Sequence, residues 1–168
     1  ADIVHMATYA PLFAHVEGWQ WRPDMIWFDN LNSVRTVSYY VQQLYGHHKG
    51  TNVLPLTMDK KPVAGTEGQN GLFASAVYDK DKKEIIVKVA NTSDKAQPLS
   101  LKFEGLKKQD VLSGGRCMKL RSADPNKDNT IEQPSAIQPQ ESPVSIDGQV
   151  LNVELEPNTF AVYIFKKG

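Results

Sequence analysis

GLFASAVYDKDKKEIIVKVA, residues 71–90, carries the clearest structural pattern in the sequence. Its two ends, residues 71–78 and 84–90, are rich in β-branched, aromatic and small apolar residues, and the short charged segment DKDKK joins them. Two such runs separated by a short polar segment are typical of a β-hairpin. The stretch therefore predicts two paired antiparallel strands.

The same pattern continues toward the C-terminus. Further strands are predicted at residues 99–103, 110–120, 145–146, 150–155 and 159–165, and residues 52–58 alternate weakly. Gly114-Gly115 indicates a bulge or bend, and Asp147-Gly148 indicates a tight turn. Residues 122–143 contain four prolines and few apolar residues, which predicts a long surface loop. Short strands at this spacing predict a β-sandwich, or jelly roll, from about residue 51 to the end.

The sequence before residue 51 has a different character. Residues 36–48 predict a helix with Thr36 or Ser38 as its N-cap and an apolar face that includes Tyr40 and Leu44. Residues 2–10 fit either a buried helix or a strand that ends at Pro11, because periodicity alone cannot separate the two. The composition changes near residue 50, so we expect a boundary between residues 1–50 and residues 51–168.

Composition limits the function classes. The chain has 168 residues, of which 40% are hydrophobic and 23% are charged, as in a globular protein. Nineteen basic and 19 acidic residues cancel, so we expect no nucleic-acid or membrane partner. No apolar run approaches the ~20 residues that span a bilayer, and no signal peptide is visible. The single Cys117 excludes an intramolecular disulfide and a cysteine-based zinc site, and no cofactor is expected.

The segment TYAPLFAHVEGWQWRPDMIWFDN, residues 8–30, holds all three tryptophans. From residue 12 onward it reads as a long loop with a buried patch at residues 25–28. Trp19 and Trp21 are two residues apart, so both can face a cleft if the chain is extended there, and tryptophan stacks well on the apolar faces of sugars. They can equally cover the edge of a core. His15 and Glu17 lie beside them and complete the set of candidate substrate-binding residues.

Other polar residues give weaker signals. Asp24 and Asp29 could be imagined as the carboxylate pair of a glycosidase, but their spacing carries no signature, and Asp24 after Pro23 suits a turn. His47 and His48 are adjacent on a predicted helix and point about 100° apart, so they do not make a metal site. The sequence Asn91-Thr92-Ser93 fits a glycosylation acceptor, but a motif this short arises readily by chance.

Three segments carry a specific resemblance, namely MATYAPLF at residues 6–13, WRPDMIWFDN at residues 21–30 and SYYVQ at residues 38–42. In this order they resemble the C-terminal part of the α-L-arabinofuranosidases of glycoside hydrolase family 51. The runs NTIEQP at residues 129–134, IQP at residues 137–139 and LEPNTFAV at residues 155–162 resemble the tail of that family. The likeness spans nearly the whole chain.

The resemblance implies a fold that is mainly β. A C-terminal, jelly-roll-like β-sandwich follows the last strand, loop and helix of a catalytic (β/α)₈ barrel. In the family, the segment that corresponds to residues 3–10 is the eighth barrel strand. The resemblance therefore places the aromatic loop on the active-site face of the barrel. It also implies hydrolysis, with retention, of terminal α-L-arabinofuranosyl residues of arabinose-containing polysaccharides. Such a substrate indicates a periplasmic or extracellular location, which the sequence itself does not specify.

The two catalytic glutamates of the family lie upstream of the stretch that matches Ala1, so the resemblance assigns no catalytic residue here and predicts an inactive fragment. Some family members use a glutamine at the end of the eighth strand to touch the sugar. Pro11 stands at or near that position, so the contact is absent here or made by another residue.

Two further hypotheses remain beside the enzyme fragment. The sandwich could bind polysaccharide by itself, or it could be purely structural, which is the reading we prefer for residues 51–168. An isolated barrel edge would expose the tryptophans, so we also expect a mobile N-terminal loop or a homo-oligomer that buries them.

Overall fold

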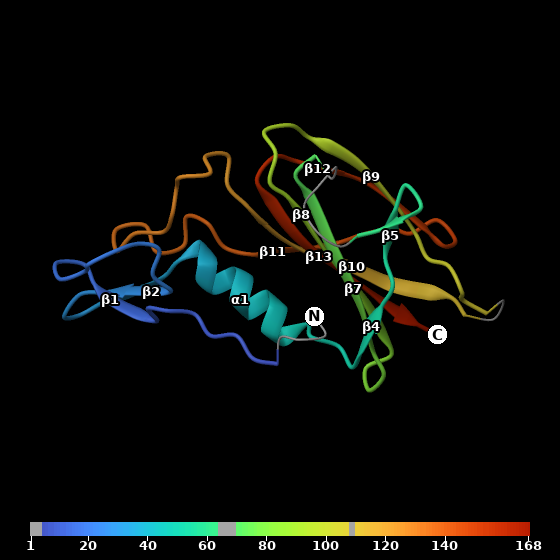
Figure 1. The fold of residues 1–168 in the computed structure, drawn as a ribbon, viewed down its shortest axis with the longest axis horizontal. Coiled ribbons are helices and arrows are strands. Elements are labelled where there is room, and N and C mark those ends of the chain that lie inside the picture. The colour runs from blue at the N-terminus through green and yellow to red at the C-terminus, as the bar shows by residue number, and fades with distance from the viewer. Residues whose placement is uncertain (1–4, 64–69, 108–109) are drawn as a thin grey trace.

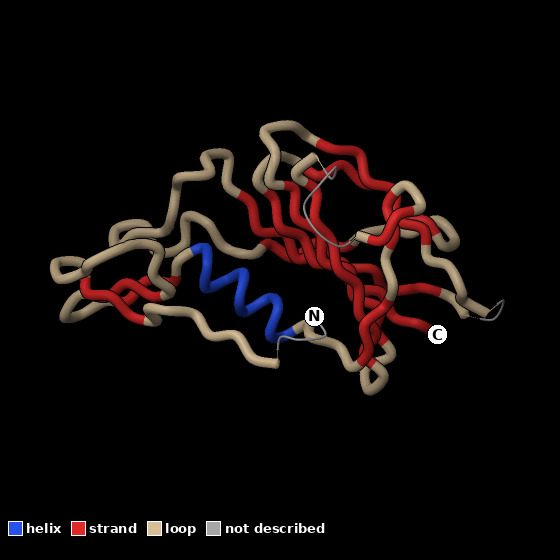
Figure 2. Tube along the Cα trace, in the orientation of Figure 1, coloured by secondary structure: helices blue, strands red, loops and turns tan. Residues whose placement is uncertain are grey.

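The computed structural model describes residues 5–63, 70–107 and 110–168, and it consists mainly of strands (Figures 1 and 2). The first part of the chain contains β1 (Phe13–His15), β2 (Ile26–Phe28), β3 (Ser33–Arg35), α1 (Val37–His47), β4 (Asn52–Leu54), β5 (Thr57–Met58) and β6 (Lys61–Pro62). The second part contains β7 (Leu72–Asp79), β8 (Glu84–Asn91), β9 (Gln97–Lys102), β10 (Leu112–Arg121), β11 (Gln140–Pro143), β12 (Val150–Leu155) and β13 (Thr159–Lys167).

A six-stranded antiparallel sheet forms the centre of the molecule, in the order β11-β10-β13-β8-β7-β4. The predicted hairpin is its β7–β8 pair, with Val77 opposite Ile86. The register of β10 against β13 shifts between Ser113 and Arg116, which confirms the bulge predicted from the two glycines.

A second sheet of two strands, β12 and β9, faces the six-stranded sheet. The main core lies between them and includes Val89, Leu151, Leu155, Ala161 and Phe165, each at most 1% exposed. Each large side chain buried in this way contributes roughly 1.5–3 kcal/mol. The predicted β-sandwich is confirmed.

Helix α1 covers the opposite face of the six-stranded sheet (Figure 1). Its N-cap is Thr36, whose hydroxyl accepts a hydrogen bond from the backbone N–H of Tyr39. Tyr40 and Leu44 are buried against a cluster that includes Ile86 of β8. The central strands are therefore covered on both faces, which is why β8 and β13 read as nearly continuous apolar runs.

Three expectations differ from the structure. Residues 5–10 form neither helix nor strand, since no described segment pairs with them, and residues 1–4 lie outside the described part. Residues 145–146 are irregular, whereas β11 lies inside the predicted loop 122–143. The β11 side chains are all exposed, so this edge strand has no apolar pattern to reveal it.

The remainder of the 122–143 loop is anchored to the N-terminal region. The carboxylate Oδ1 of Asp128 accepts a hydrogen bond of 2.8 Å from the backbone N–H of Val37, the first residue of α1. Ile131 packs against the small apolar cluster of the N-terminal strands. In Figure 1 this loop, drawn in orange, extends from β10 toward the β1–β2 end. The loop thereby joins the sandwich to residues before α1.

Candidate functional site

The aromatic segment, residues 8–30, contains β1 and β2. Together with β3, which follows it, these strands form a small separate sheet in the order β1-β2-β3. Strand β1 runs parallel to β2, with Ala14 opposite Trp27, and β3 is antiparallel to β2, with Val34 opposite Trp27. These three side chains form its buried core, and Trp27 is only 8% exposed, as predicted. The expectation of a long loop over residues 12–30 is wrong where β1 and β2 lie, whereas Met25 and Trp27 of the expected buried patch are buried.

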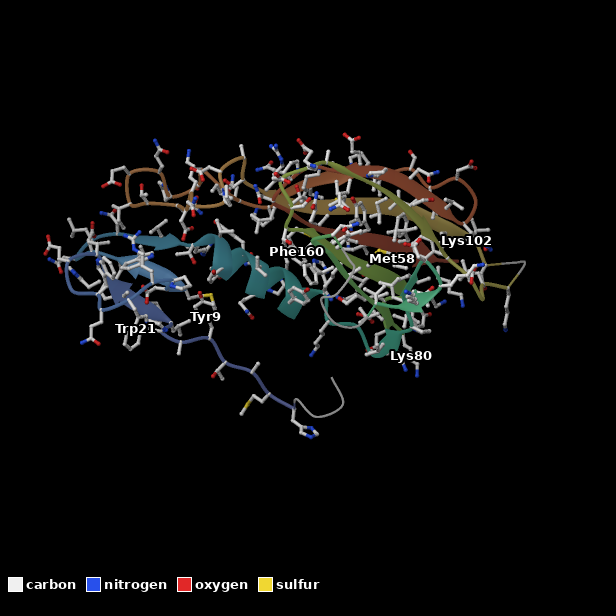
Figure 3. All side chains as sticks on the ribbon, turned by 45° about the horizontal axis from the view of Figure 1, so that its top comes forward. Tyr9, Trp21, Met58, Lys80, Lys102 and Phe160 are labelled. Atoms are coloured by element: carbon white, nitrogen blue, oxygen red, sulfur yellow. The ribbon has the colours of Figure 1, made fainter. Side chains whose placement is uncertain are left out.

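Trp19 and Trp21 are exposed at the surface of this small sheet, at 46% and 58%. The Trp19 ring meets Trp27 edge to face, with centroids 5.8 Å apart and an interplanar angle of 89°. Trp19 thus borders the small core and still presents surface to solvent. Figure 3 shows Trp21 at the same end of the molecule as Tyr9, far from Lys102 of the sandwich.

Arg22 lies over both neighbouring indole rings. Its guanidinium carbon is 4.9 Å from the ring centroid of Trp19 and 5.1 Å from that of Trp27. The sequence alone did not indicate a role for Arg22. Its only signal was an arginine placed directly after two closely spaced tryptophans.

The structure places His15 and Glu17 in one turn. The backbone N–H of Glu17 donates to Nδ1 of His15 over 3.2 Å, and the imidazole lies edge to face on Phe28, with centroids 5.2 Å apart. His15 is half-buried, whereas Glu17 is exposed. The orientation of His15 is therefore fixed by the strands around it, and the side chain of Glu17 faces solvent.

The two aspartates of the segment have different environments. The Asp29 carboxylate accepts hydrogen bonds from the backbone N–H groups of Leu31, at 2.7 Å, and Asn32, which hold the pKa of Asp29 below its ordinary value. The Asp24 side chain is 1% exposed, and neither carboxylate oxygen has a hydrogen-bond partner. The burial of Asp24 was missed, because an aspartate after a proline predicts an exposed turn.

The remaining polar candidates serve the fold. Asn91 is buried, and its Nδ2 donates to the carbonyl oxygens of Lys95, Leu155 and Glu156, which leaves no room for a glycan. Burial lowers the pKa of His48 to about 4, with further lowering by nearby cations such as Arg116. Within residues 5–63, 70–107 and 110–168, no group of three or more His, Cys, Asp or Glu side chains could hold a metal ion.

Two cavities lie away from the tryptophans. One, of about 570 Å³, opens between the two sheets near Phe103 and Lys167, and the other, of about 530 Å³, lies between α1 and the start of the 122–143 loop.

Among the described residues, no helix has both the length and the apolar character needed to cross a membrane.

Comparison with known proteins gives the same family as the sequence pattern. A family model described as the α-L-arabinofuranosidase C-terminal domain matches residues 1–159. The chain belongs to this family. Curated relatives include α-L-arabinofuranosidase 1 of Arabidopsis thaliana, which is 29% identical over 166 residues that cover 97% of this chain and 24% of the relative. Another is an extracellular exo-α-L-arabinofuranosidase of Streptomyces chartreusis, 37% identical over 62% of this chain and 12% of the relative.

A solved structure extends the likeness to the fold. An arabinose-bound family 51 α-L-arabinofuranosidase superimposes with a TM-score of 0.86 at 27% identity, over 99% of this chain and 25% of that one. The arabinofuranosidase of Thermotoga maritima shares the fold at 19% identity, with a TM-score of 0.66 over 84% of this chain and 31% of that chain. The chain therefore spans about a quarter of the length of the first relatives that it matches.

Proposed function

We propose that this chain is the C-terminal part of a retaining α-L-arabinofuranosidase. The complete enzyme would remove terminal α-L-arabinofuranosyl residues from arabinose-containing polysaccharides outside the cytoplasm. The observation that carries the proposal is the family match over residues 1–159, together with relatives about four times as long. In this assignment residues 1–50 are the edge of a (β/α)₈ barrel, and residues 51–168 are the sandwich that supports it.

The catalytic pair belongs to the rest of the enzyme. A retaining glycosidase uses two carboxyl groups about 5–5.5 Å apart, one as nucleophile and one as acid and base. The aspartates of the aromatic segment do not suit these roles, since Asp29 is held in a turn by Leu31 and Asn32 and Asp24 is closed off from solvent. The chain alone should therefore be inactive.

The aromatic segment contributes a wall of the substrate pocket. Trp19 and Trp21 offer exposed indole faces on which a sugar ring can stack, and His15 and Glu17 border the same strand and turn. At the active-site end of a barrel these residues would contact substrate without taking part in bond cleavage.

An assay with a chromogenic α-L-arabinofuranoside tests the assignment. The 168-residue chain should show no turnover, and the longer enzyme should be active. In the longer enzyme Trp21→Ala should lower kcat/KM by about tenfold, while Val53→Ala, an exposed apolar control in the sandwich, should leave it unchanged. Turnover by the isolated chain would contradict the upstream location of the catalytic pair.

The alternative is a sandwich that binds polysaccharide by itself. Its aromatic side chains argue against this role, because Phe103, Tyr163 and Phe165 are buried in the core and Tyr78 is half-buried. A structural role for residues 51–168 fits better. Affinity electrophoresis on arabinan and arabinoxylan distinguishes the binding role from the structural role. If the sandwich binds polysaccharide, the chain would be retarded in the gel even with Trp19 and Trp21 replaced by alanine.

A further inference from the structure

We propose that Arg22 binds the carboxylate of a uronic acid residue carried by the polysaccharide, and that the exposed indole of Trp19 beside it contacts the sugar ring. The inference rests on the proposed function for the polysaccharide and goes beyond it in naming an acidic sugar. It assigns a role to a cation that the neutral arabinofuranosyl substrate does not require.

The guanidinium of Arg22 is held in place before any ligand arrives. It lies 4.9 Å from the centroid of Trp19 and 5.1 Å from that of Trp27, and the two rings are perpendicular to each other. Trp27 is fixed in the core of the small sheet. A guanidinium held near aromatic rings in this way still has N–H donors to offer to an anion.

The donors of Arg22 have no acceptor within the described chain. No hydrogen bond or ion pair joins its guanidinium to any residue of 5–63, 70–107 or 110–168. The arginines of the sandwich differ, because Arg116 pairs with Glu84 at 3.2 Å and Arg121 pairs with Glu156 at 3.3 Å. Arg22 is therefore a positioned cation without an anion.

The surroundings select the class of anion. A carboxylate matches the guanidinium fork through two parallel hydrogen bonds. The exposed indole of Trp19, which lies beside the guanidinium, favours a ligand that also has an apolar ring face, which a pyranose has and inorganic phosphate lacks. A hexuronate combines the carboxylate with the ring in one residue.

Isothermal titration of the longer enzyme, in which this chain is the C-terminal part, tests the site with two matched ligands, a xylo-oligosaccharide that bears one glucuronate branch and the same oligosaccharide without it. The acidic ligand should bind about tenfold tighter, as one charge-assisted bidentate contact predicts. Arg22→Gln should remove this preference, and Arg22→Lys should retain only part of it, because an ammonium lacks the fork. The matched control is Arg35→Gln, since Arg35 lies over the single ring of Tyr39 at 5.2 Å.

Four outcomes would overturn the inference, provided that circular dichroism shows each variant folded. These are equal affinity for both ligands, a preference that survives Arg22→Gln, no binding of the acidic ligand at millimolar concentration, and equally tight binding of acetate or inorganic phosphate. The last would indicate a site for any small anion. Failure of the proposed function is distinct, because it would appear as absence of arabinofuranosidase activity in the longer enzyme.

Discussion

The side-chain amide of Asn129 donates a hydrogen bond of 2.9 Å to the backbone carbonyl oxygen of Arg35, 94 residues earlier in the chain. The same Nδ2 donates to the carbonyl oxygen of Ile137, and the Asn129 Oδ1 accepts from the Ile137 N–H, both over 2.8 Å. One buried side chain thus closes the loop on itself and fastens it to the end of β3. The orientation of the aromatic strands relative to the sandwich depends on this contact and on the neighbouring bond from Val37 to Asp128.

Asn129→Ala should destabilise the protein by about 2–4 kcal/mol, because three hydrogen bonds are lost and the buried backbone N–H and carbonyl groups of Ile137 lose these partners. Urea unfolding measures the change. The matched control is Asn126→Ala in the same loop, whose side chain is exposed and which should change stability by less than about 0.5 kcal/mol. Equal stabilities for the two variants would show that the hydrogen bonds of Asn129 contribute nothing to the free energy of unfolding.

The sequence predicted the strands that are buried on both faces, because apolar runs such as that of β8 leave a strong pattern. It did not predict β1 and β2. Each has three residues, too few for a period to emerge, and their parallel pairing joins residues 13 positions apart, as Phe13 and Ile26 are. The apolar residues of that segment indicated that side chains are buried there, but they could not indicate which strands pair to bury them.

Two glycines at the end of α1 should respond in opposite directions to the same substitution. Gly50 has a φ of +65°, and a Cβ added there would lie 2.7 Å from a methyl carbon of Val77, so Gly50→Ala should cost about 1–3 kcal/mol. Gly46 lies within α1, and an added Cβ would meet nothing within 4 Å, so Gly46→Ala should stabilise by about 0.5–1 kcal/mol. Thermal unfolding of both variants tests the pair, and a shift of the same sign in each would contradict it.

The substrate-binding role of the candidate residues stays a prediction, and their arrangement could not be read from the sequence. Trp19 and Trp21 were predicted from spacing, and both are exposed on the small sheet. The position of Arg22 over Trp27 depends on how the turn before β2 folds back, which is a tertiary contact that no local pattern encodes. The same holds for Asp24, which lies beside Thr36 because the Thr36 hydroxyl donates to its backbone carbonyl oxygen.

Stability should fall on acidification because of His48. Its pKa is about 4 in the folded protein, against an ordinary value of 6.5, because of its burial and the cations Arg116, Lys88 and Lys82. Between pH 6.5 and about 4 the unfolded chain binds a proton that the folded chain does not, so stability is present above this window and is lost as pH falls through it. His48→Gln should flatten the stability profile in that range. His47→Gln, at the exposed neighbour, removes only the smallest of the causes that lower the pKa of His48 and should change the slope much less, and an unaltered slope in His48→Gln would contradict the assignment.

The exposed apolar side chains of residues 12–21 should cause this chain to self-associate when it is studied alone. Leu12, Phe13, Trp19 and Trp21 are all exposed, and a surface this apolar is commonly covered by a partner. We expect a dimer whose population rises with concentration, measured by light scattering after gel filtration. The double change Phe13→Ser and Trp21→Ser should weaken the association by at least tenfold, whereas Val53→Ser, at an exposed apolar residue of β4, should not. A single monomeric mass at every concentration would contradict self-association, and the segment would then have to stay exposed in solution.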